Sequence, residues 1–200
     1  MAKLQFVEKS NESVAERKKL LRAYMKKRRA ENENRDVKED LLVENFFTVL
    51  ERTREMRTAG TRLCVFTYLS FSVEAGTDKL IQRLLESGDK VLCPRVEGKE
   101  MLAIEWGEDF SLSAFGIREP MGTPFDGNID LIVTPLLAAD RQGNRLGYGR
   151  GYYDTFFKKH PDAIRVGYCY DFQIVNEVPT EAWDEKLDGI VTNQEIIYVK

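Results

Sequence analysis

The feature that most constrains the fold is an alternation of short apolar runs with helical patterns. The run 129–134 (IDLIVT) is apolar almost throughout, which is typical of a parallel strand buried on both faces. The run 62–68 (RLCVFTY) precedes a helical pattern over 77–87, a stop at Gly88 and a strand over 90–93, which together predict a βαβ unit. Further strands are predicted over 101–106, 163–169, 189–192 and 196–199. We therefore expect a three-layer α/β fold, a mostly parallel sheet with helices on both faces.

Three more helices are predicted, two before this pattern and one within it. Ser13 and Glu16 have the spacing of a capping box and begin a helix over about 13–33, with an apolar stripe formed by Leu20, Leu21, Tyr24 and Met25. Two further helices are predicted over about 35–57 and 151–159, and the segment 107–126 is expected to be irregular. With 42% hydrophobic residues, residues 1–200 suffice for one core and are predicted to form a single domain.

The overall charge argues against several classes of partner. The chain has 30 Lys plus Arg against 33 Asp plus Glu, so an electrostatic grip on nucleic acid is not expected. The first residues lack the apolar region of a signal peptide, and no apolar run approaches the ~18 residues of a membrane helix. We expect a cytoplasmic monomer that binds neither nucleic acid nor membranes.

The cysteines and the single histidine favour structural roles. Cys64, Cys93 and Cys169 are far apart and lie in apolar segments, so they are predicted to be buried free thiols. His160 ends a helical pattern directly before Pro161, where an imidazole can cap the helix. Mechanisms that need a histidine triad or a histidine-rich metal site are therefore disfavoured.

The segment 140–154 (DRQGNRLGYGRGYYD) carries the strongest functional signal. It leaves a buried strand and enters a helix, and its alternate glycines allow close approach of a ligand to the backbone. Free N–H groups at the helix start, beside Arg145 and Arg150, would form a cradle for an anion such as phosphate. The spacing matches neither a Walker A loop nor a GxGxxG fingerprint, and a loop that merely turns the chain is the structural alternative.

Asp154 lies in the first turn of the predicted helix and has two interpretations. A carboxylate there interacts favourably with the helix dipole, which contributes ~0.3–1 kcal/mol. It is also a candidate ligand for Mg²⁺, which is usually held by one or two carboxylates together with nucleotide phosphates. The spacing alone does not separate these roles.

The stretch 145–154 (RLGYGRGYYD), preceded by VTPLLAAD and Gly143-Asn144, resembles the signature of the 5-formyltetrahydrofolate cyclo-ligase family. Three other stretches match this family in the same order. They are KKLLR at 18–22, YLS at 68–70 leading to Glu74, and VP at 178–179 followed by Asp184 and LD at 187–188. The resemblance covers about 18–192, and the three-layer α/β fold of the family agrees with the predicted elements.

The resemblance implies an ATP site, a folate site and a Mg²⁺ site. The residues implied to bind ATP are Lys18, Arg22, Arg145, Leu146, Gly147, Tyr148, Gly149, Arg150, Gly151, Tyr152 and Tyr153. Those predicted to act in catalysis are Arg145, Arg150 and Tyr153. Those implied to contact the folate are Leu69, Glu74, Phe115 and Tyr153. Those implied to hold Mg²⁺ are Asp154 and Asp188.

Most of these residues also have structural interpretations from the sequence alone. Lys18 and Arg22 lie four residues apart, which fits a solvated basic helix face as well as a phosphate contact. Glu74 could be a carboxylate at a helix amino terminus, Leu69 a core residue, and Asp188 an ordinary turn aspartate before a glycine. The resemblance favours the ligand-binding interpretation for each.

Two residues depart from the family pattern. Phe115 stands where some relatives have Trp, and Arg150 where relatives vary between Gly and a basic residue. An aromatic ring at 115 could still stack on the folate ring system.

The reaction implied by the resemblance converts ATP and 5-formyltetrahydrofolate, with or without a polyglutamate tail, to ADP, phosphate and 5,10-methenyltetrahydrofolate, with Mg²⁺. The formyl oxygen is phosphorylated first and N10 of the same folate then attacks, so the protein mainly positions substrates and neutralises charge. Two alternatives stay open at this point. One is a non-catalytic nucleotide- or folate-binding regulator, and the other is a sugar-phosphate isomerase on a related scaffold.

Overall fold

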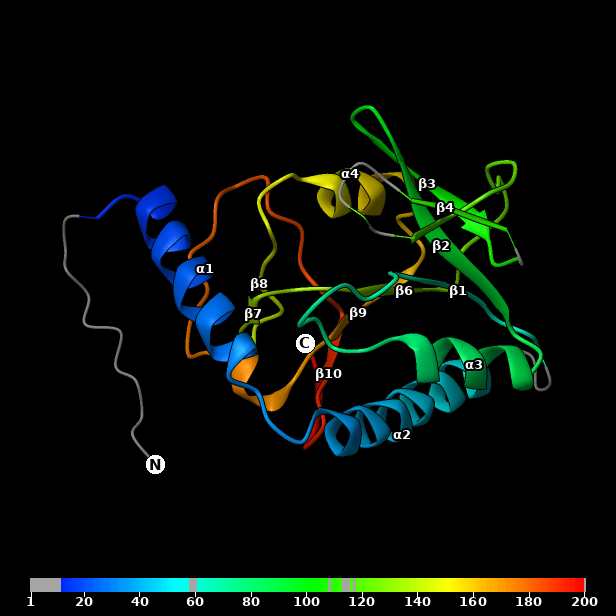
Figure 1. Ribbon diagram of the computed structural model, residues 1–200, viewed down its shortest axis with the longest axis horizontal. Helices are drawn as coiled ribbons and strands as arrows, with labels where there is room; N and C mark the ends of the chain where they lie inside the picture. Colours follow the sequence, from blue (N-terminus) through cyan, green and yellow to red (C-terminus); the bar gives the residue numbers. More distant parts are fainter. Residues whose placement is uncertain (1–11, 58–60, 108, 113–115, 117, 200) are drawn as a thin grey trace.

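The chain forms a central sheet with helices on both faces (Figure 1). The structure is a computed structural model that describes residues 12–57, 61–107, 109–112, 116 and 118–199. Within these residues the sheet has seven strands in the order β11-β10-β9-β6-β1-β2-β3. They are β1 (Cys64–Thr67), β2 (Lys90–Glu97), β3 (Glu100–Glu105), β6 (Leu131–Thr134), β9 (Ile164–Tyr168), β10 (Gly189–Val191) and β11 (Ile196–Tyr198). The predicted mostly parallel α/β sheet is confirmed.

The remaining elements surround this sheet. The helices are α1 (Val14–Ala30), α2 (Arg35–Glu55), α3 (Asp78–Glu86), α4 (Tyr152–Lys159) and a short 3₁₀ helix, η1 (Asp171–Gln173). Two small antiparallel pairs join β4 (Phe110–Leu112) to β5 (Arg118–Pro120) and β7 (Ala138–Ala139) to β8 (Arg145–Leu146). The prediction that 107–126 is irregular is therefore wrong at β4 and β5.

The parallel strands lie in the middle of the sheet and both edge strands are antiparallel. β1, β2, β6, β9 and β10 pair in parallel, whereas β3 pairs antiparallel with β2 and β11 pairs antiparallel with β10. Every residue of β1 and β6 is buried, which explains their continuous apolar sequences.

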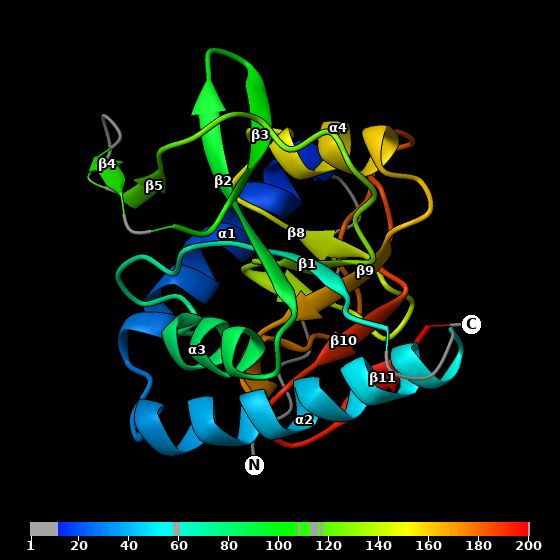
Figure 2. The ribbon, with the colours of Figure 1, turned by 90° about the vertical axis from the view of Figure 1, so that its right-hand side faces the viewer.

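Helices cover the two faces of the sheet in separate layers (Figure 2). α2 and α3 pack on one face, where Phe46 and Leu80 join a core with Val65 and Val133. α4 packs on the other face, where Phe156 and Phe157 meet Phe66, Ile132 and Ile190. Alternate residues of the strands thus face two different cores, as the pleat requires.

α1 lies beyond the carboxyl ends of the parallel strands, against the β7–β8 pair (Figure 1). Its predicted capping box is present, with Ser13 and Glu16 bonded reciprocally. The predicted apolar stripe is wrong in part, because Leu20 is 49% exposed. The buried residues of α1 are Lys18, Leu21, Met25 and Arg29. This helix therefore turns two cations toward the protein interior.

The structure also bears on the predictions for the cysteines, the histidine and membrane-spanning helices. Cys64, Cys93 and Cys169 are free and buried, as predicted. His160 is the C-cap residue of α4, but its backbone N–H and not its imidazole donates to the carbonyls of Phe156 and Phe157. Its ring centroid lies 4.5 Å from that of Phe156. In the part of the chain that the structure describes, none of the helices has the length and apolar character that crossing a bilayer requires.

Candidate active site

The glycine-rich loop, residues 147–151, connects β8 to α4. Gly149 and Gly151 have φ values of +93° and +71°, a backbone conformation that favours glycine. A Cβ atom at Gly149 would lie 3.2 Å from Nη2 of Arg22, so a larger residue there would crowd this arginine. Arg22 Nε donates a 2.9 Å hydrogen bond to the carbonyl of Gly147. The structure thus joins α1 to the loop through Arg22, a residue predicted at the ATP site.

A buried carboxylate fixes the turn ahead of this loop. Asp140 is fully buried and accepts hydrogen bonds from the backbone N–H groups of Gln142, Asn144 and Val178 and from the Asn144 side chain. The sequence analysis assigned no role to this residue. The sequence signal for this role is an aspartate at the start of a turn, because an Asp side chain there commonly accepts the backbone N–H two residues later.

Arg145 and Asp154 form an ion pair beside the loop. Nη2 of Arg145 lies 2.7 Å from Oδ1 of Asp154, and the two side chains are 7% and 25% exposed. Burial lowers the pKa of Arg145 below its usual value, although the charge of Asp154 opposes this shift. The guanidinium also lies over the ring of Phe157, 4.9 Å from its centroid. The Asp154 carboxylate additionally accepts the backbone N–H of Glu185 at 3.2 Å.

Lys18 reaches the same region from α1. It is buried, and its Nζ donates hydrogen bonds of 2.7 Å to Glu181 and 2.6 Å to Asp184. Burial alone lowers the pKa of Lys18, but the two carboxylates raise it above its ordinary value overall. The charge of Asp184 also acts on Arg145. The segment 181–185 therefore gathers Lys18, Arg145 and Asp154 into one charged cluster, and the interpretation of Lys18 as part of a solvated helix face is wrong.

Glu74 lies near the glycine-rich loop, because Arg29 binds both the carbonyl of the preceding Val73 and the hydroxyl of Tyr148. One carboxylate oxygen accepts the backbone N–H of Phe71 at 3.0 Å. Burial raises the pKa of Tyr148 to about 12, and the charge of Glu74 and a hydrogen bond to it contribute to this rise. Burial, followed by the charge of Glu74, also raises the pKa of Tyr153. The charge of the predicted folate carboxylate thus affects two tyrosines of the predicted ATP site.

One residue of this region has no predicted role. Arg29, at the end of α1, donates from Nε to the carbonyl of Val73 at 3.0 Å and from Nη1 to the hydroxyl of Tyr148 at 2.9 Å. In the sequence it is the last of a run of basic residues (KKRR) that looks solvent-exposed. Its signal is the spacing Lys18, Leu21, Met25, Arg29, which places it on the buried face of the helix.

The other predicted ATP-site residues occupy varied environments. Arg150 is exposed on the loop, and Tyr152 is half-buried with its hydroxyl donating to the carbonyl of Gly98. Leu146 is buried against Leu21 of α1 and helps to hold the loop rather than presenting a polar group.

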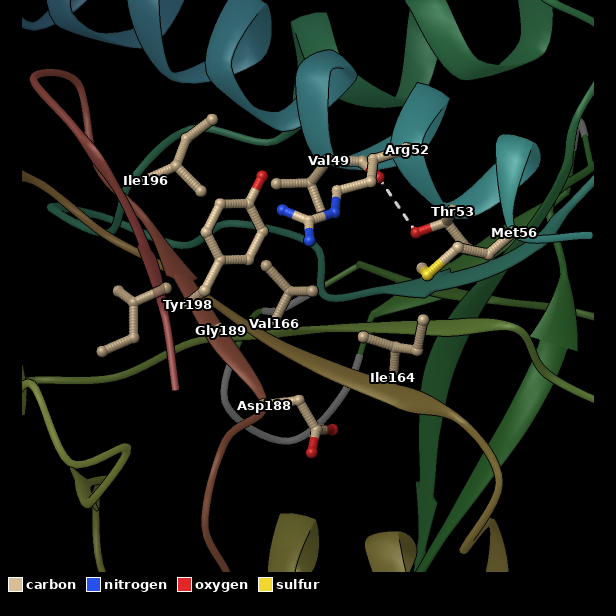
Figure 3. Close-up of a pocket in the computed structure, with 11 residues that line it drawn as sticks. Val49, Arg52, Thr53, Met56, Ile164, Val166, Asp188, Gly189, Ile196 and Tyr198 are labelled. Atoms are coloured by element: carbon tan, nitrogen blue, oxygen red, sulfur yellow. Dashed lines mark hydrogen bonds between the residues drawn. The ribbon is translucent and has the colours of Figure 1, made fainter. Parts of the chain in front are cut away.

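The remaining predicted folate and metal residues are Leu69, Phe115 and Asp188. Leu69 is buried in the core beneath α2 and α3, and Phe115 lies outside the described residues. The Asp188 carboxylate accepts the N–H of Arg165 at 2.8 Å. It lines a cavity of about 150 Å³ between α2 and strands β9 to β11 (Figure 3). No hydrogen bond or ion pair among the described residues joins it to Asp154.

The residues around the loop fit a bound phosphate group. Nε of Arg145 and the hydroxyl of Tyr153 are buried and have no hydrogen-bond partner within the described residues. Buried donors of this kind are costly unless a ligand or water satisfies them. No group of three or more His, Cys, Asp and Glu side chains in the described part of the chain could hold a metal ion. A Mg²⁺ ion here would therefore need phosphate oxygens in addition to Asp154.

The fold and the site together define an α/β protein with a glycine-rich loop that lies beside Arg22 and Arg145, beyond the carboxyl ends of its parallel strands. The sequence model of the 5-formyltetrahydrofolate cyclo-ligase family matches residues 14–193. The chain belongs to this family and is thus an enzyme of the ligase class, from folate one-carbon metabolism.

Known relatives agree with this assignment. The chain is 32% identical over 168 residues to 5-formyltetrahydrofolate cyclo-ligase of Escherichia coli K12, covering 73% of this chain and 92% of that protein. A probable 5-formyltetrahydrofolate cyclo-ligase of Schizosaccharomyces pombe is 31% identical over 145 residues, covering 62% and 71% of the two chains. The fold is similar to 5,10-methenyltetrahydrofolate synthetase of Aquifex aeolicus, with a TM-score of 0.73, 26% identity and coverage of 92% and 93%.

Proposed function

We propose that this protein catalyses the ATP- and Mg²⁺-dependent cyclisation of 5-formyltetrahydrofolate to 5,10-methenyltetrahydrofolate, releasing ADP and phosphate. The observation that carries the proposal is the meeting of two loops. The glycine-rich loop, with Arg22 and Arg145 beside it, is suited to phosphate groups. Glu74, suited to the N–H donors of a pterin, directly follows Val73, and Arg29 joins the Val73 carbonyl to Tyr148 of the glycine-rich loop. Family membership supports cyclo-ligase activity as such.

The proposed chemistry needs activation of a poor leaving group. The formyl oxygen attacks the γ-phosphorus of ATP, the bond to the bridging oxygen breaks, and ADP leaves. N10 of the same folate then attacks the formyl carbon, the carbon–oxygen bond breaks with departure of phosphate, and N10 loses its proton. Because the second attack is intramolecular, the protein contributes chiefly by orienting the folate and excluding competing water.

Cations of this chain would supply the electrostatic part of catalysis. Arg145 is held by Asp154 on one side and has its Nε unpartnered within the described residues, so it is suited to donate to phosphoryl oxygens. The buried hydroxyl of Tyr153 is a second donor with no protein partner there. Arg22 and the backbone N–H groups of the glycine-rich loop would hold the remaining phosphates.

Lys18 is proposed to reach the nucleotide only after rearrangement of its own partners. Its ammonium group is shared by Glu181 and Asp184, which also repel an incoming triphosphate. Binding of ATP would exchange part of this pairing for contacts with phosphate oxygens.

Asp154 is proposed to bind Mg²⁺ together with phosphate oxygens. The ion would neutralise charge on the phosphates when it is bound. Asp188 stays a predicted second ligand, and its role requires it to leave the N–H of Arg165. Leu69 and Phe115 stay predicted folate contacts, and Arg150 and Tyr152 predicted nucleotide contacts. A monomeric state, a cytoplasmic location and acceptance of a polyglutamate tail also stay predictions.

A coupled absorbance assay for methenyl-folate formation tests the proposal directly. Product and phosphate should appear in equal amounts, and only when both ATP and 5-formyltetrahydrofolate are present. A protein that binds both ligands without releasing phosphate would instead be a non-catalytic regulator. Turnover of a sugar phosphate without ATP would favour an isomerase and contradict the proposal.

A further inference from the structure

Arg29 joins two loops that are far apart in the sequence. The residue is 2% exposed, so little water competes for its hydrogen bonds. Nε binds the carbonyl of Val73, and Nη1 binds the hydroxyl of Tyr148. The guanidinium also lies over the Tyr148 ring, 5.8 Å from the centroid. One buried side chain thus holds the backbone of one loop and the side chain of another.

These two loops are the ones proposed to bind different substrates. Val73 directly precedes Glu74, the proposed folate carboxylate, whereas Tyr148 belongs to the glycine-rich loop proposed to bind ATP. The charge of Glu74 also contributes to the raised pKa of Tyr148, after burial. Arg29 therefore bridges the loop that carries Glu74 and the loop that carries Tyr148.

An arginine is suited to this position for a geometric reason. Its planar fork offers donors in fixed directions, so two acceptors bonded to it are held in a fixed relation. A lysine presents a single flexible point charge and would hold the two loops less rigidly.

We infer that Arg29 is a positioning residue that couples the two sites, so that binding of either substrate raises the affinity for the other. The inference rests on the proposed function. A ligand that orders one loop also orders the other through the shared guanidinium, so the second ligand pays a smaller entropic cost. Thermodynamic linkage requires the same factor in both directions.

The test measures affinities rather than turnover. Isothermal titration calorimetry gives the affinity for the non-hydrolysable β,γ-imido analogue of ATP, with and without saturating 5-formyltetrahydrofolate, and the reciprocal titration gives the folate affinity. In the wild-type protein each affinity should rise about 5-fold or more when the other ligand is present. The coupling ratio is the affinity for one ligand in the presence of the other, divided by its affinity alone. In Arg29→Met this ratio should fall to about one. In Tyr148→Phe it should also fall, because the bridging hydroxyl is lost.

Arg28→Met is the matched control. Arg28 is the preceding residue on α1, but it donates to the Tyr24 hydroxyl and lies over the Phe172 ring, away from both loops. Its variant should keep the wild-type ratio. Circular dichroism shows whether each variant is folded, and if Arg29→Met is not, Tyr148→Phe decides.

Three results would overturn the inference. The first is a ratio of about one in a wild-type protein that binds both ligands. The second is a wild-type ratio in folded Arg29→Met or, if that variant does not fold, in Tyr148→Phe. The third is a ratio in Arg28→Met that falls as far as in Arg29→Met. Failure of the wild-type protein to bind either ligand refutes the proposed function itself and removes the basis of the inference.

Discussion

Replacing Asp154 by Asn removes one negative charge and keeps the size of the side chain. In the structure this charge faces the buried guanidinium of Arg145 at 2.7 Å. An exposed ion pair contributes ~0–1 kcal/mol, and breaking a fully buried pair costs ~3–5 kcal/mol. Because Asp154 is 25% exposed and Arg145 only 7%, we expect an intermediate loss of about 2 kcal/mol in the free energy of unfolding.

The predicted loss can be measured as a change in the thermal midpoint. For a chain of this size ~1 kcal/mol corresponds to ~2–4 °C, so the Asp154→Asn midpoint should fall by about 4–8 °C. A double-mutant cycle with Arg145→Met isolates the interaction between the two side chains. A coupling energy below ~0.5 kcal/mol would refute the structural importance of this pair.

The same variant tests the metal assignment independently of its stability. If Asp154 holds Mg²⁺, the variant should lose most activity and recover part of it at higher Mg²⁺ concentration. The helix dipole alone would predict a stability loss of at most ~1 kcal/mol, but the ion pair with Arg145 adds a structural cost. Stability alone therefore cannot separate the two roles. A wild-type dependence of activity on Mg²⁺ would exclude Asp154 as a ligand.

Three further substitutions have defined outcomes. Lys18→Met should weaken ATP binding tenfold or more in calorimetry, because it removes a charged donor. Lys19→Met, a change at an exposed position of the same helix, should not. Equal ATP affinities of Lys18→Met and the wild-type protein would exclude Lys18 from the site. Glu74→Gln should weaken folate binding measured without nucleotide and leave ATP binding measured alone near wild type; an unaltered folate affinity would contradict its assignment. Burial and the charge of Lys159 lower the pKa of His160, so folding favours the neutral imidazole. The contribution of this group to the free energy of unfolding is therefore present above pH 6.5 and is lost as the pH falls below that value. His160→Gln should therefore reduce the fall in thermal midpoint between pH 7 and pH 5, and an unchanged slope would count against this role.

The sheet was predictable because its central strands are buried on both faces. β1 and β6 stand out as short apolar segments, since no residue of either strand faces water. The direction of β3 was not predictable, because an apolar pattern has the same appearance in either direction. β4 was missed because it has only three residues and they are half-buried or exposed, so the alternation of Phe110, Ser111 and Leu112 is too short to indicate a strand.

The glycine-rich loop of the site was predictable from the sequence, but the contacts between its distant segments were not. Glycines and arginines that are close in sequence identify the loop, but the partners of Lys18 are Glu181 and Asp184, more than 160 residues away. Without the fold, Lys18 and Arg29 look like other cations of a basic helix. Only the contacts in three dimensions distinguish a buried, hydrogen-bonded cation from a solvated one.

The burial of the cysteines has a practical consequence for chemical labelling. Burial raises the pKa of both Cys64 and Cys93 to about 12, and it raises that of Cys169 as well. Since the thiolate is the reactive form, the folded protein should resist alkylation at neutral pH. Alkylation of these thiols would then occur mainly in molecules that open, and its rate would report how often the native core unfolds. A single cysteine introduced at an exposed position could accordingly carry a spectroscopic probe without removal of the native thiols.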